Sequence, residues 1–207
     1  IFWSRFYGVR EGDELTLTIG GADATLEQDN DLNVLNVVSA QDVSVVDVDA
    51  IATGDVSARS LTLSTGGSIS QVMGTSVTQT GDADLSASAG GIYFDALSND
   101  FQTVDASAAT IVLVDADAII LRDIDASGAL NVRSVSASIA DDGAAGVPGE
   151  DVNAGGAATF TASTTITLTN ATNDFAGDVN ASAGGAIALR DANTIQLADI
   201  DAATSLT

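Results

Sequence analysis

The sequence contains no cysteine and no histidine, and all six of its basic residues are arginine. Without cysteine there is no disulfide framework and no thiolate metal site. Without histidine, Ser-His-Asp triads and the usual zinc, copper and haem sites are excluded. A glycine-rich phosphate loop is excluded as well, because its lysine is missing. We therefore predict that the chain is not an enzyme, and we assign no catalytic, cofactor-binding or metal-ligating residue.

Aromatic residues and proline are also scarce. Aromatics make up 4% of the 207 residues, and Pro148 is the one proline, so collagen and polyproline helices are excluded. A globular core usually relies on large rings for its buried area. The apolar fraction of 45% is supplied mainly by Val, Ile, Leu and Ala. Such side chains suit thin stacked layers better than a thick globular core.

Positive charge is rare, and the formal net charge is −23. Nucleic acids and anionic membranes are bound by basic patches, so we predict neither as a partner. No apolar run approaches the roughly 20 residues of a membrane-spanning helix, and we predict no membrane insertion. The arginines are scattered along the chain at Arg5, Arg10, Arg59, Arg122, Arg133 and Arg190.

An internal repeat is visible in the acidic tetrapeptides. Asp47–Ala50 (DVDA) recurs as Asp123–Ala126 (DIDA) and Asp199–Ala202 (DIDA), at equal intervals of 76 residues. A longer block, Asp115–Ala126, matches Asp191–Ala202 at the same offset. A unit of this length without a helical period predicts about four solenoid turns of roughly 19 residues.

Short alternating segments indicate strands almost everywhere. The clearest are residues 15–19, 43–48, 60–63, 111–114, 118–121, 132–139, 158–168 and 194–197. Gly-Gly and Asn-Asp pairs between them indicate turns. No helical pattern intervenes, which leaves a β-sandwich, a β-barrel or a solenoid.

The repeat favours the solenoid among these three, because each solenoid turn must stack in register on its neighbours. In residues 123–125 the alternation predicts Ile124 inward and both aspartates outward. Phe101 and Phe175, each preceded by Asn-Asp, are predicted to be inward rings at equivalent corners. Residues 141–156 show no strand pattern and are predicted to form a loop.

Several segments resemble the β-helical repeats of filamentous-haemagglutinin-like exoproteins, the large adhesins of two-partner secretion. The resemblance lies in residues 173–179 (NDFAGDV), 184–189 (GGAIAL) and 191–197 (DANTIQL), with 99–101 and 61–69 in the same style. It implies a right-handed parallel β-helix with an extracellular or cell-surface location and an adhesive or filament-forming role. It implies no catalytic residues.

Calcium is the one metal for which the sequence offers ligands. Asp-x-Asp pairs occur at 47/49, 82/84, 115/117, 123/125 and 199/201. Two residues apart on one strand, the paired carboxylates lie about 7 Å apart, which is too far for one pair to chelate an ion alone. Both a solvated acidic face and occupied calcium sites remain open as interpretations.

The first residues differ from the rest of the chain, because Phe2, Trp3, Phe6 and Tyr7 gather there. We interpret residues 1–14 as a cap over the solenoid core or as an assembly contact. Residues 15–207 form the predicted solenoid array, with units at roughly 30–98, 99–172 and an incomplete 173–207.

Two functions from different classes follow from this interpretation. The first is a non-enzymatic structural or adhesive segment of a large extracellular surface protein, whose partners are cell-surface glycans or proteins. The second is a self-assembling subunit of a filament or sheath, whose partner is another copy of the chain. A carbohydrate-active β-helix enzyme is a distant third.

Overall fold

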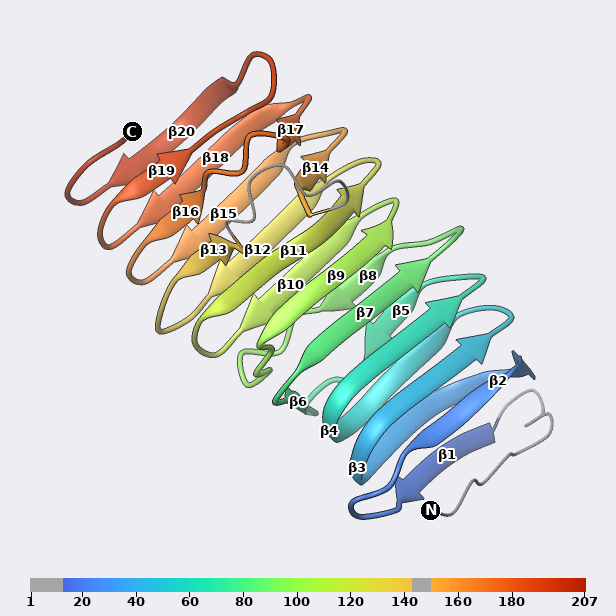
Figure 1. Ribbon diagram of the computed structural model, residues 1–207. Helices are drawn as coiled ribbons and strands as arrows, with labels where there is room; N and C mark the ends of the chain where they lie inside the picture. Colours follow the sequence, from blue (N-terminus) through green and yellow to red (C-terminus); the bar gives the residue numbers. More distant parts are fainter. Residues whose placement is uncertain (1–12, 143–149) are drawn as a thin grey trace.

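The computed structural model of the chain describes residues 13–142 and 150–207. Within these ranges the chain forms twenty β-strands and no helix. The strands pair in parallel from one solenoid turn, or coil, to the next. Together they make a β-solenoid of about nine coils, visible in Figure 1 as a ladder of arrows. The predicted all-β parallel β-helix is confirmed, and its right-handed winding stays a prediction.

The strands follow one another closely along the chain. Their bounds are β1 (Asp13–Thr18), β2 (Ala24–Asn30), β3 (Leu32–Asp47), β4 (Ile51–Thr65), β5 (Ile69–Gln71), β6 (Val77–Gln79), β7 (Asp82–Ala87), β8 (Ile92–Phe94), β9 (Thr103–Ala108), β10 (Ile111–Asp115), β11 (Ile119–Ala126), β12 (Leu130–Ser134), β13 (Ile139–Asp141), β14 (Val152–Ala154), β15 (Ala158–Ala162), β16 (Ile166–Leu168), β17 (Asp174–Phe175), β18 (Asp178–Ala183), β19 (Ile187–Leu189) and β20 (Gln196–Ala202).

Strands from successive coils gather into stacks that run along the solenoid. One stack contains β5, β8, β10, β12, β15, β18 and β20. A second contains β7, β9, β11, β14 and β17. A third joins the first half of β11 to β13, β16 and β19. From β10 to β19, successive coils thus contribute strands to all three stacks.

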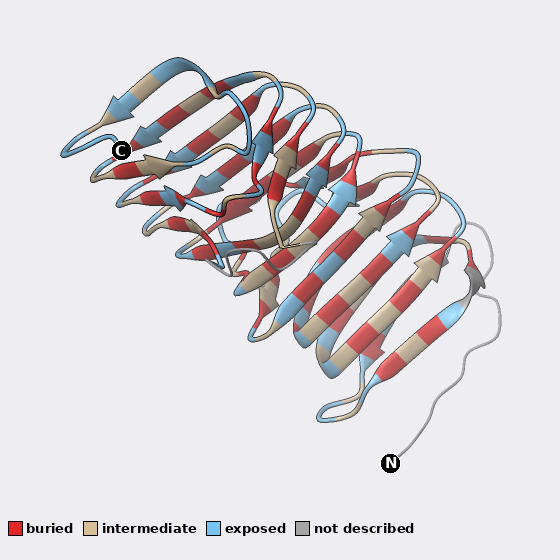
Figure 2. Cartoon of the chain, turned by 45° about the horizontal axis from the view of Figure 1, so that its top comes forward, coloured by how far each residue is buried: buried red, intermediate tan, exposed pale blue. Residues whose placement is uncertain are grey.

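Columns of buried aliphatic side chains fill the interior. Successive residues of a strand point to opposite faces, so every second residue faces the core. Figure 2 shows this as buried bands alternating with exposed ones along the strands. Two columns of fully or almost fully buried register partners are Ile51, Ile69, Ile92 and Ile111, and then Ile119, Ile139, Ile166 and Ile187. β-Branched residues suit such columns because their stiff side chains pack well on a pleated surface.

Some boundaries differ from those predicted. The loop predicted for residues 141–156 contains β14, whose Val152 is fully buried opposite Ile124 of β11. The single strands predicted for 132–139 and 158–168 are each divided by a corner, because the solenoid must bend after about five residues. Such bends carry no glycine or proline here, so the strand pattern runs through them.

The 76-residue offset does not correspond to four whole coils. Ile111 stacks on Leu130, and that column continues through Ala158 to Val179, three coils later. Ile187, 76 residues after Ile111, lies instead in the stack that holds Ile119. In this half of the chain the offset is therefore three coils and part of a fourth, fewer than the predicted four or so. In the first half, four coils lead from Val46 to Asp125, a separation of 79 residues that lies close to the prediction.

The tetrapeptides that first marked the repeat are not structurally equivalent. Val48 is 48% exposed, whereas Ile124 is fully buried, as predicted. Asp47 is itself buried, so the alternation of the first tetrapeptide is reversed. Residues 1–12 of the proposed cap, with Phe2, Trp3, Phe6 and Tyr7, lie outside the described residues, whereas Asp13 and Glu14 belong to β1. No observation tests the unit boundaries.

Candidate functional site

Two corners of the solenoid begin with an asparagine in the sequence Asn-Asp-Phe. The Oδ1 atom of Asn99 accepts a hydrogen bond from the backbone nitrogen of Val77 at 2.9 Å. The Oδ1 atom of Asn173 accepts one from the backbone nitrogen of Val152 at 2.8 Å. Both asparagines are completely buried. Each side chain therefore satisfies a buried backbone N–H of the preceding coil, which would otherwise lack an acceptor.

Besides the backbone N–H, each of these asparagines binds one side chain of the preceding coil. Gln71 Nε2 donates to Asn99 Oδ1 at 2.7 Å, and Asn99 Nδ2 donates to Gln71 Oε1 at 3.1 Å. Asn173 Nδ2 donates to Asp141 Oδ2 at 3.1 Å. Gln71 and Asp141 each also accept from the backbone N–H three residues before the asparagine. We call each of these arrangements an amide clamp, and each one joins two coils through buried groups.

The backbone N–H groups of the phenylalanines that end these sequences donate to carboxylates, of which Asp115 is buried and Asp191 is half-buried. Phe101 donates its backbone N–H to Asp115 Oδ2 at 2.6 Å, and Asp117 donates its own to Asp115 Oδ1 at 2.8 Å. Phe175 donates to Asp191 Oδ2 at 2.8 Å in the same way. Both phenylalanine rings are buried at corners, as predicted.

Each buried ring also meets a second ring edge to face. Phe94 and Phe101 have ring centroids 5.5 Å apart with an interplanar angle of 73°. Phe160 and Phe175 have centroids 5.8 Å apart at 74°. Edge-to-face pairs of this kind add about 0.5–1.5 kcal/mol beyond the burial of their area. The two corners therefore agree in their aromatic contacts as well as in their hydrogen bonds.

A third carboxylate of this kind lies near the start of the described chain. Asp47 Oδ2 accepts from the backbone nitrogen of Leu32 at 2.8 Å, and its Oδ1 accepts from Asp49 at 3.2 Å. Burial raises the pKa of Asp47 and raises that of Asp115 to about 6. The two backbone donors oppose this effect at each site but do not cancel it. At both aspartates desolvation raises the pKa by more than the backbone hydrogen bonds lower it.

The Asp-x-Asp pairs considered for calcium do not share one environment. Asp47 and Asp115 point into corners, whereas Asp82 and Asp84 are exposed on β7. Among the described residues no three or more acidic side chains are grouped so that they could hold a metal ion. In the pair 123/125, Ile124 points inward as predicted, Asp125 is exposed and Asp123 is half-buried.

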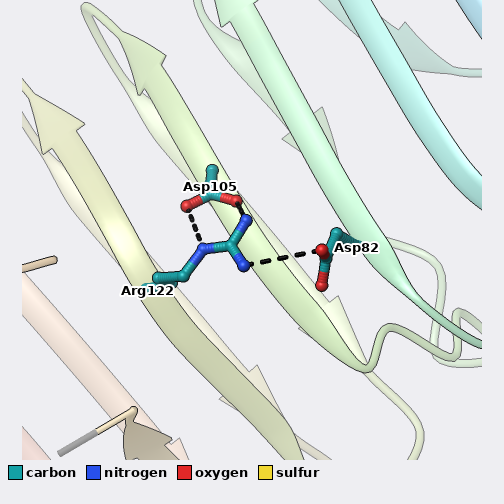
Figure 3. A network of polar contacts seen from close by, with 3 residues as sticks. All are labelled: Asp82, Asp105 and Arg122. Carbon is teal, nitrogen blue, oxygen red and sulfur yellow. Dashed lines mark hydrogen bonds and ion pairs between the residues drawn. The ribbon is translucent and has the colours of Figure 1, made fainter. Parts of the chain in front are cut away.

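Two arginines link neighbouring coils on the outer surface. Arg122 Nε donates to Asp105 Oδ1 at 2.8 Å, and its Nη2 bonds the other oxygen of the same carboxylate. Its Nη1 reaches Asp82 Oδ2, 3.5 Å away, so that β7, β9 and β11 are joined (Figure 3). Arg59 binds Asp42 in the same bidentate way, with its Nε and Nη2 donating to the two carboxylate oxygens. A guanidinium fork suits this task because it binds a carboxylate in two places.

A shallow polar groove crosses the second stack. Its floor is a row of register partners from five successive coils: Ser86, Ser107, Asp125, Asn153 and Asp174. The groove has a volume of about 550 Å³. Asn153 Nδ2 donates to Asp125 Oδ1 at 3.1 Å, and the backbone nitrogen of Asp174 donates to Asn153 Oδ1 at 3.1 Å. Asn153 thus joins the coils on either side of it through its side chain.

The amide clamps were missed at the level of sequence. Asn99 and Asn173 were recognised only as turn residues, and Gln71 and Asp141 were not singled out. The recurrence of Asn-Asp-Phe was the available signal. Gln71 and Asp141 are different residue types. That both bind the asparagine of the next coil is visible only when the coils are stacked.

Comparison with known proteins places these features in a family. In the part of the chain that the structure describes, no helix is long and apolar enough to cross a membrane. No curated protein and no solved structure matches the chain. A family model described as repeats of unknown function (DUF5649) matches twice, over residues 40–108 and 106–182. These matches span well over half of the sequence and include both Asn-Asp-Phe corners, and the chain therefore belongs to the DUF5649 repeat family.

Proposed function

We propose that this chain is a stiff, non-enzymatic β-solenoid spacer within an extracellular, adhesin-like surface protein. The observation that carries the proposal is that side chains tie neighbouring coils together at several places along the solenoid. Asn99 and Asn173 clamp the coils from inside, and Arg122 joins three strands from outside. A rod whose coils share one core and are cross-linked in this way resists bending.

The dimensions and charge of the solenoid suit a spacer. About nine coils, at about 4.8 Å each, give a rod roughly 45 Å long. The net charge of −23 keeps such a rod soluble and separate from like-charged neighbours. The resemblance to filamentous-haemagglutinin-like repeats supports the extracellular location. Cell-surface glycans or proteins are the partners that we propose for the larger protein.

Electron microscopy of the purified chain tests this proposal, with and without calcium. We expect isolated short rods in both conditions. Rods that lengthen or cluster only with calcium would contradict a spacer that acts without a cofactor. Turnover of an acidic polysaccharide by the same preparation would contradict the non-enzymatic assignment.

A self-assembling filament subunit is the second candidate, and one observation favours it. Successive coils pair in parallel and in register, as β15 does with β18 and β16 with β19. A strand of the same pattern from another copy can add to such a stack by the same pairing. Sedimentation velocity over a range of concentrations separates the candidates, because a filament subunit grows and a spacer does not.

A further inference from the structure

Two β-turns project side by side from consecutive coils. The first, Val72–Thr75, is closed by a hydrogen bond from the Thr75 nitrogen to the Val72 oxygen at 3.2 Å. The second, Ala96–Asn99, is closed by a bond from the Asn99 nitrogen to the Ala96 oxygen at 3.3 Å. Residues from both line a hollow of about 670 Å³. We call this pair the paired turns.

Large apolar side chains occupy the tips of the paired turns. Met73 is 98% exposed, Leu97 is 57% exposed, and Val72 beside them is 38% exposed. Met73 and Leu97 each occupy the second position of their turn. Gly74, with a φ of +87°, supplies the left-handed residue that the first turn requires. The turns therefore present apolar side chains on a rod whose exposed surface is otherwise mainly small and polar.

One side chain holds both turns in place. Gln71 Nε2 donates to the Thr75 oxygen at 3.2 Å, and Gln71 Oε1 accepts from the Ala96 nitrogen at 3.3 Å. The same amide forms the clamp with Asn99. The tips are thus fixed relative to one another before any partner arrives, so binding has little ordering entropy to overcome.

The fold itself does not require these apolar tips. The corner at Asn173 is preceded by an equivalent turn, closed by a bond from its nitrogen to the Asn170 oxygen at 3.4 Å. In that turn Ala171 stands where Leu97 stands in the first one. Since the corner is built with alanine at one site, the exposed leucine at the other has no evident structural task.

The charge around the paired turns indicates what they bind. Asp95 lines the hollow, and Asp55 lies beside the first turn, where it accepts from the Ser76 nitrogen at 2.9 Å. None of the residues that line the hollow is basic. A second copy of this chain, also at −23, would be repelled. A partner with positive charge and apolar side chains complements both features.

We propose that the paired turns are a docking site for a basic polypeptide segment. Its apolar side chains pack on Met73 and Leu97, and its Lys or Arg side chains face Asp55 and Asp95. This inference goes beyond the spacer role, because a rod is equally stiff with or without a lateral contact.

Fluorescence anisotropy with three short labelled peptides tests the proposal. The peptides alternate Lys with Leu, Lys with Ser, and Glu with Leu. We expect the Lys-Leu peptide to bind best and the double variant M73S/L97A to bind it at least about tenfold more weakly. The variant L197S is the matched control, because Leu197 is 43% exposed on β20, several coils away from the paired turns. We expect this control to change the affinity less than twofold.

Three outcomes would overturn the proposal. The first is an absence of binding by the Lys-Leu peptide. The second is equal binding to the wild type and to M73S/L97A, which would mean that charge alone attracts the peptide. The third is self-association of the wild type in high salt that M73S/L97A abolishes, which would make a second copy the occupant.

Discussion

Asp115 accepts a hydrogen bond from the backbone nitrogen of Phe101 in the preceding coil, at 2.6 Å. Asp191 stands in the same relationship to Phe175, at 2.8 Å. Both phenylalanines follow a buried asparagine that clamps its coil to the one before. The repeated sequence blocks thus fold into repeated contacts, even though they lie on different stacks of the solenoid. The corner, rather than the whole coil, is the unit that recurs.

Removing an amide clamp should destabilise the solenoid strongly. In Asn99→Ala the buried N–H of Val77 loses its side-chain acceptor, and Gln71 loses both of its bonds to Asn99 while keeping those to Thr75 and Ala96. We expect the free energy of unfolding to fall by about 2–4 kcal/mol, because unsatisfied buried polar groups are costly. Urea denaturation followed by circular dichroism measures the change. Asn131→Ala, on the exposed face of β12, is the control and should change stability by less than about 0.5 kcal/mol. Equal effects in the two variants would contradict the role of the clamp.

The buried carboxylate at Asp115 should make the protein more stable in mild acid than at neutral pH. Its folded pKa of about 6 lies above its ordinary value of 3.8, so the folded state binds the proton more tightly. The stabilisation is complete below about pH 4 and is lost as the pH rises through 6. The loss amounts to about 2–3 kcal/mol for this group.

Urea denaturation at a series of pH values measures this dependence. Asp47, Asp84, Asp100 and Asp123 have pKa values raised mainly by burial and act in the same direction. Asp115→Asn is uncharged at every pH, so it should flatten the slope, and its cost relative to the wild type should be larger at pH 4 than at pH 7. A wild-type stability that rises from pH 5 to pH 7 would contradict the prediction.

The arginine link on the outer surface should depend on salt. Arg122→Gln leaves Asp82 and Asp105 without their cation, and it leaves the nearby Asp84 and Asp123 carboxylates less balanced. We expect a loss of about 1 kcal/mol at low ionic strength that shrinks as salt is added. Arg59→Gln removes a more exposed fork and should cost less. Thermal denaturation at several salt concentrations is the measurement, and a cost independent of salt would refute the electrostatic explanation.

Close stacking of coils should make Gly177 intolerant of a side chain. A Cβ atom there would lie 2.5 Å from the Gly156 oxygen, in the backbone of the preceding coil. Gly177→Ala should therefore destabilise by about 1–3 kcal/mol through overpacking. Gly21→Ala, where a Cβ meets nothing within 4 Å, is the matched control. If both variants melt at the same temperature, the coils are less tightly stacked than the structure indicates.

The sequence predicted the parts of the fold that depend on local pattern. The inward Ile124 and the corner rings Phe101 and Phe175 followed from alternation and from the Asn-Asp pairs. The bends after Ser134 and Ala162 did not, because no glycine or proline marks them. The Gln71–Asn99 clamp was beyond prediction, since it joins residues 28 apart whose neighbourhood depends on the length of each coil. The tetrapeptides that begin at Asp47 and Asp123 are alike in sequence but not in structure, because a buried corner aspartate and a surface aspartate cannot be told apart by residue type.

The central claim is that the coils form one stiff rod. The chain lacks cysteine, so Ser57→Cys and Ser182→Cys, both on exposed strand positions, give two unique sites for nitroxide labels. Pulsed electron–electron double resonance then measures the distribution of distances between the two labels. We predict one narrow distribution that is unchanged by salt and by protein concentration. A broad distribution, or one that shifts with salt, would show a chain that bends between coils and would contradict the spacer account.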